Sequence, residues 1–122
     1  MNILIDTHIL IWYVEGNTKL SKTHQEAIDS EQNTLFFSMA SLWEMAIKLS
    51  INKLKLNGSL ENLLPERINI LPIELEHILQ VQSLPFHHSD PFDRLIIAQA
   101  MINGFEIMTV DEHFAHYLVS LI

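Results

Sequence analysis

The chain has 122 residues, a length typical of a single domain that buries a core of its own. Apolar residues make up 48% of it and charged residues 18%, which indicates a globular protein and excludes a disordered one. The sequence contains no cysteine, so disulfides, thiolate metal sites and cysteine nucleophiles are excluded. This composition fits a reducing cytoplasm.

The net charge of −8 bears on the partners that the protein can bind. A protein that holds nucleic acid through phosphate contacts alone is expected to be basic. Either nucleic acid is irrelevant here, or some acids gather in a pocket where divalent cations reverse the local field. The positions of the acids therefore matter more than their number.

The first half of the chain predicts two strands, each followed by helical segments. Residues 2–5 form a short apolar strand, and residues 7–14 an apolar helix. Ser21 caps an amphipathic helix that runs to about Ser30. Residues 34–38 are a β-branched and aromatic strand, and residues 41–49 a mostly apolar helix. The opening residues have no basic leader, so we expect no signal peptide there, and no stretch approaches the roughly 20 apolar residues of a membrane span.

The second half continues the alternation. We expect helices at 59–64, 74–84, 91–103 and 112–117, and strands at 68–73, 106–110 and, as a last short piece, 119–122. Pro91 suits the first turn of its helix, and Gly104 a helix end. Strands that alternate with helices predict an α/β fold with a mostly parallel sheet.

Four acids occupy positions from which they can meet. Asp6 and Asp111 each follow an apolar strand, Asp93 lies in the first turn of the 91–103 helix, and Glu44 lies on an otherwise apolar helix. Right-handed crossovers bring the carboxyl ends of parallel strands and the starts of the following helices to one edge of the sheet. We therefore expect three or four carboxylates at that edge.

Such a cluster predicts a metal site. Bare carboxylates that lie together repel, and each is driven to hold a proton. A divalent cation removes this difficulty, and an all-oxygen set of ligands suits Mg²⁺ or Mn²⁺. The chemistry that fits such a pocket is metal-assisted hydrolysis of a phosphodiester bond.

Each of these acids also has a purely structural interpretation. Asp6 and Asp90 lie where a helix cap belongs. Glu44 lies four residues before Lys48, where a surface ion pair contributes only about 0.2–0.5 kcal/mol. For Asp90 and Glu44 the sequence leaves both interpretations open.

The seven histidines raise the question of a transition-metal site. Adjacent residues of an extended segment, such as His87 and His88, point to opposite faces, and a pair such as His113 and His116 near a chain end is often solvent-facing. The sequence therefore favours solvent-facing histidines over a zinc site. His113 and His8 follow a site acid by two residues and are expected to be its local hydrogen-bonding partners.

Several blocks of the sequence resemble a known family. Asp6-Thr7, Trp43-Glu44, residues 93–100 and Thr109-Val110-Asp111 are similar to the characteristic blocks of PIN-domain ribonucleases. The closer resemblance, carried by Asp6-Thr7-His8 and residues 41–48 and 84–94, is to VapC-type toxins of bacterial toxin–antitoxin pairs. It runs nearly from end to end in order and spacing.

This resemblance implies a single PIN domain over residues 1–122, with a mostly parallel central sheet between helices in a three-layer fold. It also implies a Mg²⁺- or Mn²⁺-dependent endoribonuclease that acts on cellular RNA, a small cognate antitoxin that inhibits it, and a homodimer that assembles further with the antitoxin. No membrane partner is implied.

The family's acidic quartet is matched here by four residues, Asp6, Glu44, Asp93 and Asp111. The resemblance makes Asp6 and Asp93 the main metal ligands, while Glu44 and Asp111 complete the site through water or a second ion. Asp90, Thr7 and Arg94 are accessory candidates: an additional acid, a residue that orients a metal-bound water, and a phosphate contact. For Arg94 the sequence slightly favours an exposed helix position without that contact. We expect several of the seven Lys and Arg residues to surround the site.

Other functions place different demands on the sequence. A receiver-like phospho-acceptor domain needs an acidic pair after its first strand and a late lysine, but Asp6 stands alone and no Lys or Arg follows Arg94. A haloacid-dehalogenase-like phosphatase needs a second Asp where His8 stands. The remaining alternative is a non-catalytic PIN-like binding or regulatory module.

Overall fold

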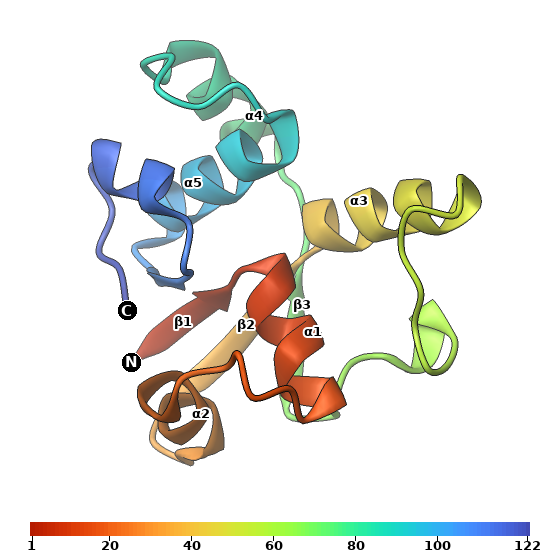
Figure 1. Ribbon diagram of the computed structural model, residues 1–122. Coiled ribbons are helices and arrows are strands. Elements are labelled where there is room, and N and C mark those ends of the chain that lie inside the picture. The colour runs from red at the N-terminus through yellow and green to blue at the C-terminus, as the bar shows by residue number, and fades with distance from the viewer.

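The computed structural model describes all 122 residues (Figure 1). Four parallel strands form one sheet in the order β3-β2-β1-β4. They are β1 (Asn2–Ile5), β2 (Thr34–Ser38), β3 (Ile68–Leu71) and β4 (Glu106–Met108). The helices are α1 (Thr7–Glu15), α2 (Lys22–Asp29), α3 (Met39–Ser50), α4 (Leu75–Ser83) and α5 (Pro91–Asn103), with two 3₁₀ turns, η1 (Leu60–Asn62) and η2 (Glu112–His116).

The two faces of the sheet bury separate apolar clusters, because side chains alternate along each strand. Ile3 and Ile5 of β1 pack in one cluster with Ile9 of α1 and Ile28 of α2. Leu4, between them, packs on the opposite face in the cluster that contains the buried residues of α5. Figure 1 shows α1 and α2 on one side of the sheet and α5 on the other, with α4 packed outside α5. The predicted three-layer α/β fold is confirmed.

The strand order creates a switch point between β1 and β4. The chain moves outward from β1 to β2 and β3, and then returns across the sheet so that β4 pairs with the free side of β1. In open α/β sheets, the crevice for ligands lies outside the carboxyl ends of the strands at such a point. Asp6 follows β1 directly, which places its carboxylate at this crevice.

Buried polar contacts join α5 to the centre of the fold. Gln99 is fully buried, and its side chain accepts a hydrogen bond from the Ser38 hydroxyl and donates one of 3.1 Å to the Pro72 carbonyl. The same Ser38 hydroxyl accepts from the Ala40 N–H and caps α3. The ends of β2 and β3 are therefore tied to α5, so the start of α3 and the body of α5 have a fixed relation.

Most predicted elements are confirmed within two residues, and the exceptions have physical causes. The strand expected at 119–122 is a single bridge between Leu121 and Ile107. The helix expected at 59–64 is one 3₁₀ turn, since Gly58 and Pro65 leave no room for a longer hydrogen-bond ladder. Pro72 ends β3 at Leu71 because it has no N–H to donate. No helix combines the length and the apolarity that a membrane crossing demands.

Candidate metal centre

Asp6 is fixed by donors to both of its carboxylate oxygens. Oδ1 accepts from the Thr7 N–H at 2.8 Å, so Asp6 does cap α1. Oδ2 accepts from the Thr109 hydroxyl at 2.7 Å. Asp6 is 6% exposed, so its carboxylate is buried and held in one orientation by the two chain segments that follow β1 and β4. The structural interpretation of this acid as a helix cap is therefore confirmed, and its role as a metal ligand stays a prediction.

Asp111 is held in a similar way, two residues beyond Thr109. Its N–H donates to the Thr109 hydroxyl at 3.0 Å. Its Oδ1 accepts from the backbone N–H of His113 at 2.9 Å and lies 3.0 Å from Nδ1 of the same residue, so the predicted local partner is confirmed. His8, by contrast, makes no hydrogen bond to Asp6; it is exposed at the edge of the site.

Glu44 reaches the site from the second turn of α3. It is 9% exposed, and its Oε1 lies 3.4 Å from the Thr7 hydroxyl, the donor. Its Oε2 lies 3.5 Å from Nζ of Lys48, one helical turn later. The ion pair with Lys48 is present, with the Lys48 side chain 41% exposed, and both residues also line the acidic cavity described below.

Asp90 and Asp93 enter from the start of α5. Oδ1 of Asp90 accepts from the N–H groups of Phe92 and Asp93, at 2.9 and 3.0 Å, which makes Asp90 the helix cap. Pro91 occupies the first helical position, where its missing N–H costs nothing. This cap turns the Asp93 side chain toward the crevice.

All five acids line one cavity of about 180 Å³. Thr7, His8, Lys48 and Val110 complete its walls. The four acids of the predicted quartet thus lie together, as does Asp90, although they come from positions 6, 44, 90, 93 and 111 of the sequence. Every carboxylate in the cavity is an oxygen donor of the kind that Mg²⁺ and Mn²⁺ prefer.

The electrostatics of the cavity favour a bound cation. Burial raises the pKa of Asp93 to about 8, and the charges of Asp6, Asp90, Glu44 and Asp111 add to this shift. Burial also raises the pKa of Asp6, against the hydrogen bonds from Thr109 and Thr7. For Asp111, burial is outweighed by hydrogen bonds from His113 and His88, and its pKa lies below the ordinary value. A divalent cation would relieve the repulsion that keeps a proton on Asp93.

His88 is the residue of this site that sequence reasoning missed. Its Nε2 lies 3.0 Å from Oδ2 of Asp93 and 3.1 Å from Oδ2 of Asp111. Its Nδ1 accepts the N–H of Asp90 at 3.2 Å, so the ring proton must be on Nε2. The Nε2–H group therefore points between the carboxyl groups of Asp93 and Asp111. The segment 84–90 has no regular periodicity, so only the tertiary structure reveals this contact.

This hydrogen-bond pattern argues against a histidine metal site. Ligand atoms of His88, Asp111 and His113 lie within 4.8 Å of one another. However, Nε2 of His88 carries a proton in this arrangement, and a metal ligand must offer a lone pair. His113 and His116 are exposed, as predicted. The acidic cavity, by contrast, brings five carboxylates together.

The fold is that of a known family. The sequence profile of the PIN domain matches residues 3–118, which is nearly the whole chain. The chain belongs to the PIN domain family. No curated protein sequence gives a significant match.

Solved structures show the same PIN fold at low sequence identity. VapBC2 from Rickettsia felis bound to a promoter DNA fragment matches with a TM-score of 0.76 at 16% identity, over 100% of this chain and 98% of the other. VapBC-1 from nontypeable Haemophilus influenzae matches with a TM-score of 0.67 at 18% identity, over 100% and 97%. FitAcB from Neisseria gonorrhoeae matches with a TM-score of 0.64 at 20% identity, over 98% and 96%.

Arg94 does not line the acidic cavity, and the expectation of an exposed helix residue is wrong. The residue is 8% exposed, and its guanidinium lies below the segment 81–88. It donates to the carbonyls of Val81, Leu84, Pro85 and His88 and to the Tyr117 hydroxyl, at 3.1 to 3.4 Å. Periodicity alone could not reveal this, because the segment before α5 folds back over Arg94.

Few basic residues surround the acidic cavity, so the expectation that several Lys and Arg residues lie there is wrong. Lys48 is the only Lys or Arg that lines the cavity. Arg67 donates to the carbonyls of Ile28 and Ser30 and thus ties β3 to the end of α2. Both arginines of the PIN domain therefore have structural roles.

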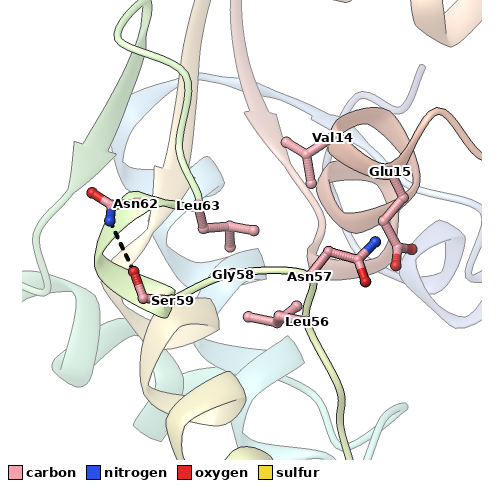
Figure 2. Close-up of a pocket in the computed structure, with 8 residues that line it drawn as sticks. All are labelled: Val14, Glu15, Leu56, Asn57, Gly58, Ser59, Asn62 and Leu63. Carbon is pink, nitrogen blue, oxygen red and sulfur yellow. Dashed lines mark hydrogen bonds between the residues drawn. The ribbon is translucent and has the colours of Figure 1, made fainter.

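A different hollow of about 180 Å³ lies between the end of α1 and the segment around η1 (Figure 2). Its lining residues are Val14, Glu15, Leu56, Asn57, Gly58, Ser59, Asn62 and Leu63. Figure 2 shows a hydrogen bond within it, from the Asn62 amide to the Ser59 hydroxyl at 3.0 Å. This hollow has a single carboxylate, Glu15, where the acidic cavity has five, so it is the less suitable site for a divalent cation.

Proposed function

We propose that this PIN domain is a divalent-metal-dependent endoribonuclease of the VapC toxin type. The observation that carries the proposal is the convergence of Asp6, Glu44, Asp93 and Asp111 in one cavity at the switch point of the sheet. A ribonuclease of this kind needs oxygen ligands for a metal beside an open crevice for the phosphate. Mg²⁺ and Mn²⁺ both fit the ligand set.

Each acid has a role that follows from its contacts. Asp6 and Asp93 would be the main ligands, since both side chains are largely shielded from solvent and both line the cavity, one from the end of β1 and the other from the first turn of α5. Glu44 and Asp111 would complete the site, directly or through water. When bound, the cation would lower the pKa of an attacking water and offset the charge of the phosphate. The His88 N–H would keep Asp93 and Asp111 close together.

Thr7 and Asp90 would position two of the proposed metal ligands, Glu44 and Asp93. The Thr7 hydroxyl donates to Glu44, and Asp90 caps the helix that carries Asp93. Asp90 also lines the cavity, which leaves it available as an additional acid. Arg94 would hold the His88 segment in place and would not contact phosphate.

The toxin assignment includes a cognate antitoxin as partner. Three of the similar solved structures are named VapBC, two are named FitAB or FitAcB, and another is described as a toxin–antitoxin complex from Klebsiella pneumoniae. An apolar groove of about 490 Å³, lined by Leu42, Leu60, Glu61, Leu64 and Ile70, offers a surface for such a protein. We propose that the antitoxin also supplies a blocking or cationic group at the acidic cavity, and that the toxin is a cytoplasmic homodimer.

The test is cleavage of a mixed RNA substrate by the purified chain, freed of any partner. Reactions with EDTA, Mg²⁺ or Mn²⁺ would be run beside Asp6→Asn and Asp93→Asn, each checked for folding. Glu66→Gln, which changes an exposed acid outside the cavity, is the matched control. The proposal expects cleavage that requires metal, disappears in both cavity variants and persists in the control.

The result also decides between an enzyme and a binding module. Cleavage that survives in Asp6→Asn and Asp93→Asn would indicate a contaminating nuclease. Absence of cleavage, together with Mn²⁺ binding that both variants lose, would favour the non-catalytic PIN module.

A further inference from the structure

A second hollow borders the acidic cavity. It has a volume of about 330 Å³ and is lined by Phe86, His87, His88, Ser89 and His113. His88 joins the two spaces, because it lines this hollow while its Nε2 contacts Asp93 and Asp111 in the acidic one. A group bound here would lie next to any phosphate held at the metal centre.

The hollow is walled mainly by flat π-systems. Four of its five lining side chains are aromatic or imidazole rings. His88 and His113 have ring centroids 5.2 Å apart. Phe86 is 76% exposed, although a phenyl ring normally avoids water. The Arg94 guanidinium lies 4.7 Å from the centre of the Phe86 ring, which supports that ring from the protein side.

The segment that carries these rings is held rigidly. The Tyr117 hydroxyl accepts the N–H groups of His87 and His88 at 3.0 and 2.9 Å. From below, Arg94 donates to the carbonyls of Pro85 and His88. A flat ligand would therefore find the rings already ordered, which reduces the entropic cost of binding.

Charge restricts the ways in which this protein can hold RNA. The chain has seven basic residues against 15 acidic ones. Arg67 and Arg94 are engaged with carbonyls, and Lys22 and Lys48 have carboxylate partners. Few basic side chains are consequently available to contact phosphate, so the RNA backbone alone would bind this surface weakly. Stacking on an aromatic side chain stabilises a single-stranded base without any basic residue.

We infer that this hollow is a base-stacking subsite for single-stranded RNA, which takes the base of a nucleotide next to the scissile phosphate. The inference rests on the proposed ribonuclease function and adds to it the source of substrate affinity. Phe86 and His87 provide the exposed rings, and His88 marks the boundary with the metal centre. Because every base has a π-face, this subsite is tolerant of sequence.

The experiment measures inhibition of RNA cleavage by two 12-residue competitors, a deoxyadenosine oligonucleotide and an abasic chain with the same backbone. For the wild type, we expect the base-containing competitor to inhibit on the order of tenfold more tightly. Phe86→Leu keeps an apolar cover over Arg94 but removes the ring, so it should abolish this difference and raise KM by a similar factor, with kcat little changed. Phe86→Trp should restore both.

Leu118→Ala is the matched control, since it removes an even more exposed apolar side chain (92%) that does not line the hollow. It should behave as wild type. Equal inhibition by the two competitors, or an unchanged KM in Phe86→Leu, would overturn the subsite while the ribonuclease itself stands. A wild type that cuts no RNA would end both proposals. Loss of self-association in Phe86→Leu at unchanged KM would also overturn the subsite and assign the ring to a protein contact.

Discussion

The hydroxyl of Thr109 donates a 2.7 Å hydrogen bond to Oδ2 of Asp6, although the two residues are 103 positions apart. Asp6 follows β1 and Thr109 follows β4, so this contact closes the switch point of the sheet. The same hydroxyl accepts the N–H of Asp111 at 3.0 Å. One threonine therefore positions two of the proposed metal ligands.

Replacing Thr109 with Val should weaken the metal centre without changing the size of the side chain. The variant loses the donor to a buried carboxylate, and we expect it to unfold about 1–2 kcal/mol more easily in urea. Its Mn²⁺ affinity should fall about tenfold, because positioning partners of metal ligands commonly have effects of that size. Thr109→Ser, which keeps the hydroxyl, should stay close to wild type in both measurements.

The metal-free protein should lose stability as the pH rises. The pKa of Asp93 is about 8 in the folded protein, while an unfolded Asp titrates near its ordinary value, so the folded state binds more protons between roughly pH 4 and 8. The free energy of unfolding must therefore fall across this window, and the raised pKa of Asp6 acts in the same sense. The pKa of Asp111 is lowered, so this residue has the opposite effect: it increases the free energy of unfolding as the pH rises, at pH values below the ordinary pKa of Asp.

Asp93→Asn isolates this effect. In EDTA we expect the variant to be more stable than wild type at pH 8, by about 1–3 kcal/mol, and the gain to shrink toward pH 4. Urea unfolding at a series of pH values measures it. A wild type and variant with parallel pH profiles would show that Asp93 titrates normally.

His88 should affect metal binding through its orientation of the carboxylates. His88→Asn keeps an acceptor for the Asp90 N–H but does not reach Asp93, so we expect about a tenfold weaker Mn²⁺ affinity. His88→Gln places an amide N–H near the position of Nε2 and should retain more of the affinity. His87→Ala serves as the control, since His87 has no contact with an acid of the cavity. Mn²⁺ titrations in which all three variants equal the wild type would exclude this role.

Arg94 should behave as a structural residue. Arg94→Met leaves four carbonyls and the Tyr117 hydroxyl without this donor, so we expect a loss of about 2–4 kcal/mol in unfolding free energy. The exposed Lys53→Met should change stability by less than about 0.5 kcal/mol. A surface phosphate-binding arginine would instead leave stability unchanged and weaken RNA binding, and that outcome would contradict the role assigned here.

The sequence predicts the acidic edge well because topology alone determines it. Once Asp6 and Asp111 follow parallel strands and Asp93 opens a helix, the crossover rule brings them together. Glu44 could not be decided in advance, since a residue at the margin of an apolar stripe faces inward or outward according to what packs against α3. The structure shows the ion pair with Lys48 and places both side chains on the wall of the acidic cavity.

The other residues at or beside the cavity lie in irregular segments, where the sequence has no helical or strand periodicity from which their positions could be predicted. His88 and Phe86 lie in the stretch between α4 and α5, whose shape is set by Arg94 and Tyr117. The strand expected at the end of the chain failed for a related reason. β4 has only three residues, and the last segment pairs with it at one position, Leu121 opposite Ile107.

Calorimetric titration of the chain with Mn²⁺ would show whether the acidic cavity binds a divalent cation. We expect saturable binding to the wild type and to Glu66→Gln, and loss of that binding in Asp93→Asn. Equal Mn²⁺ binding by Asp93→Asn and the wild type would place the metal outside this cavity and contradict the proposed site.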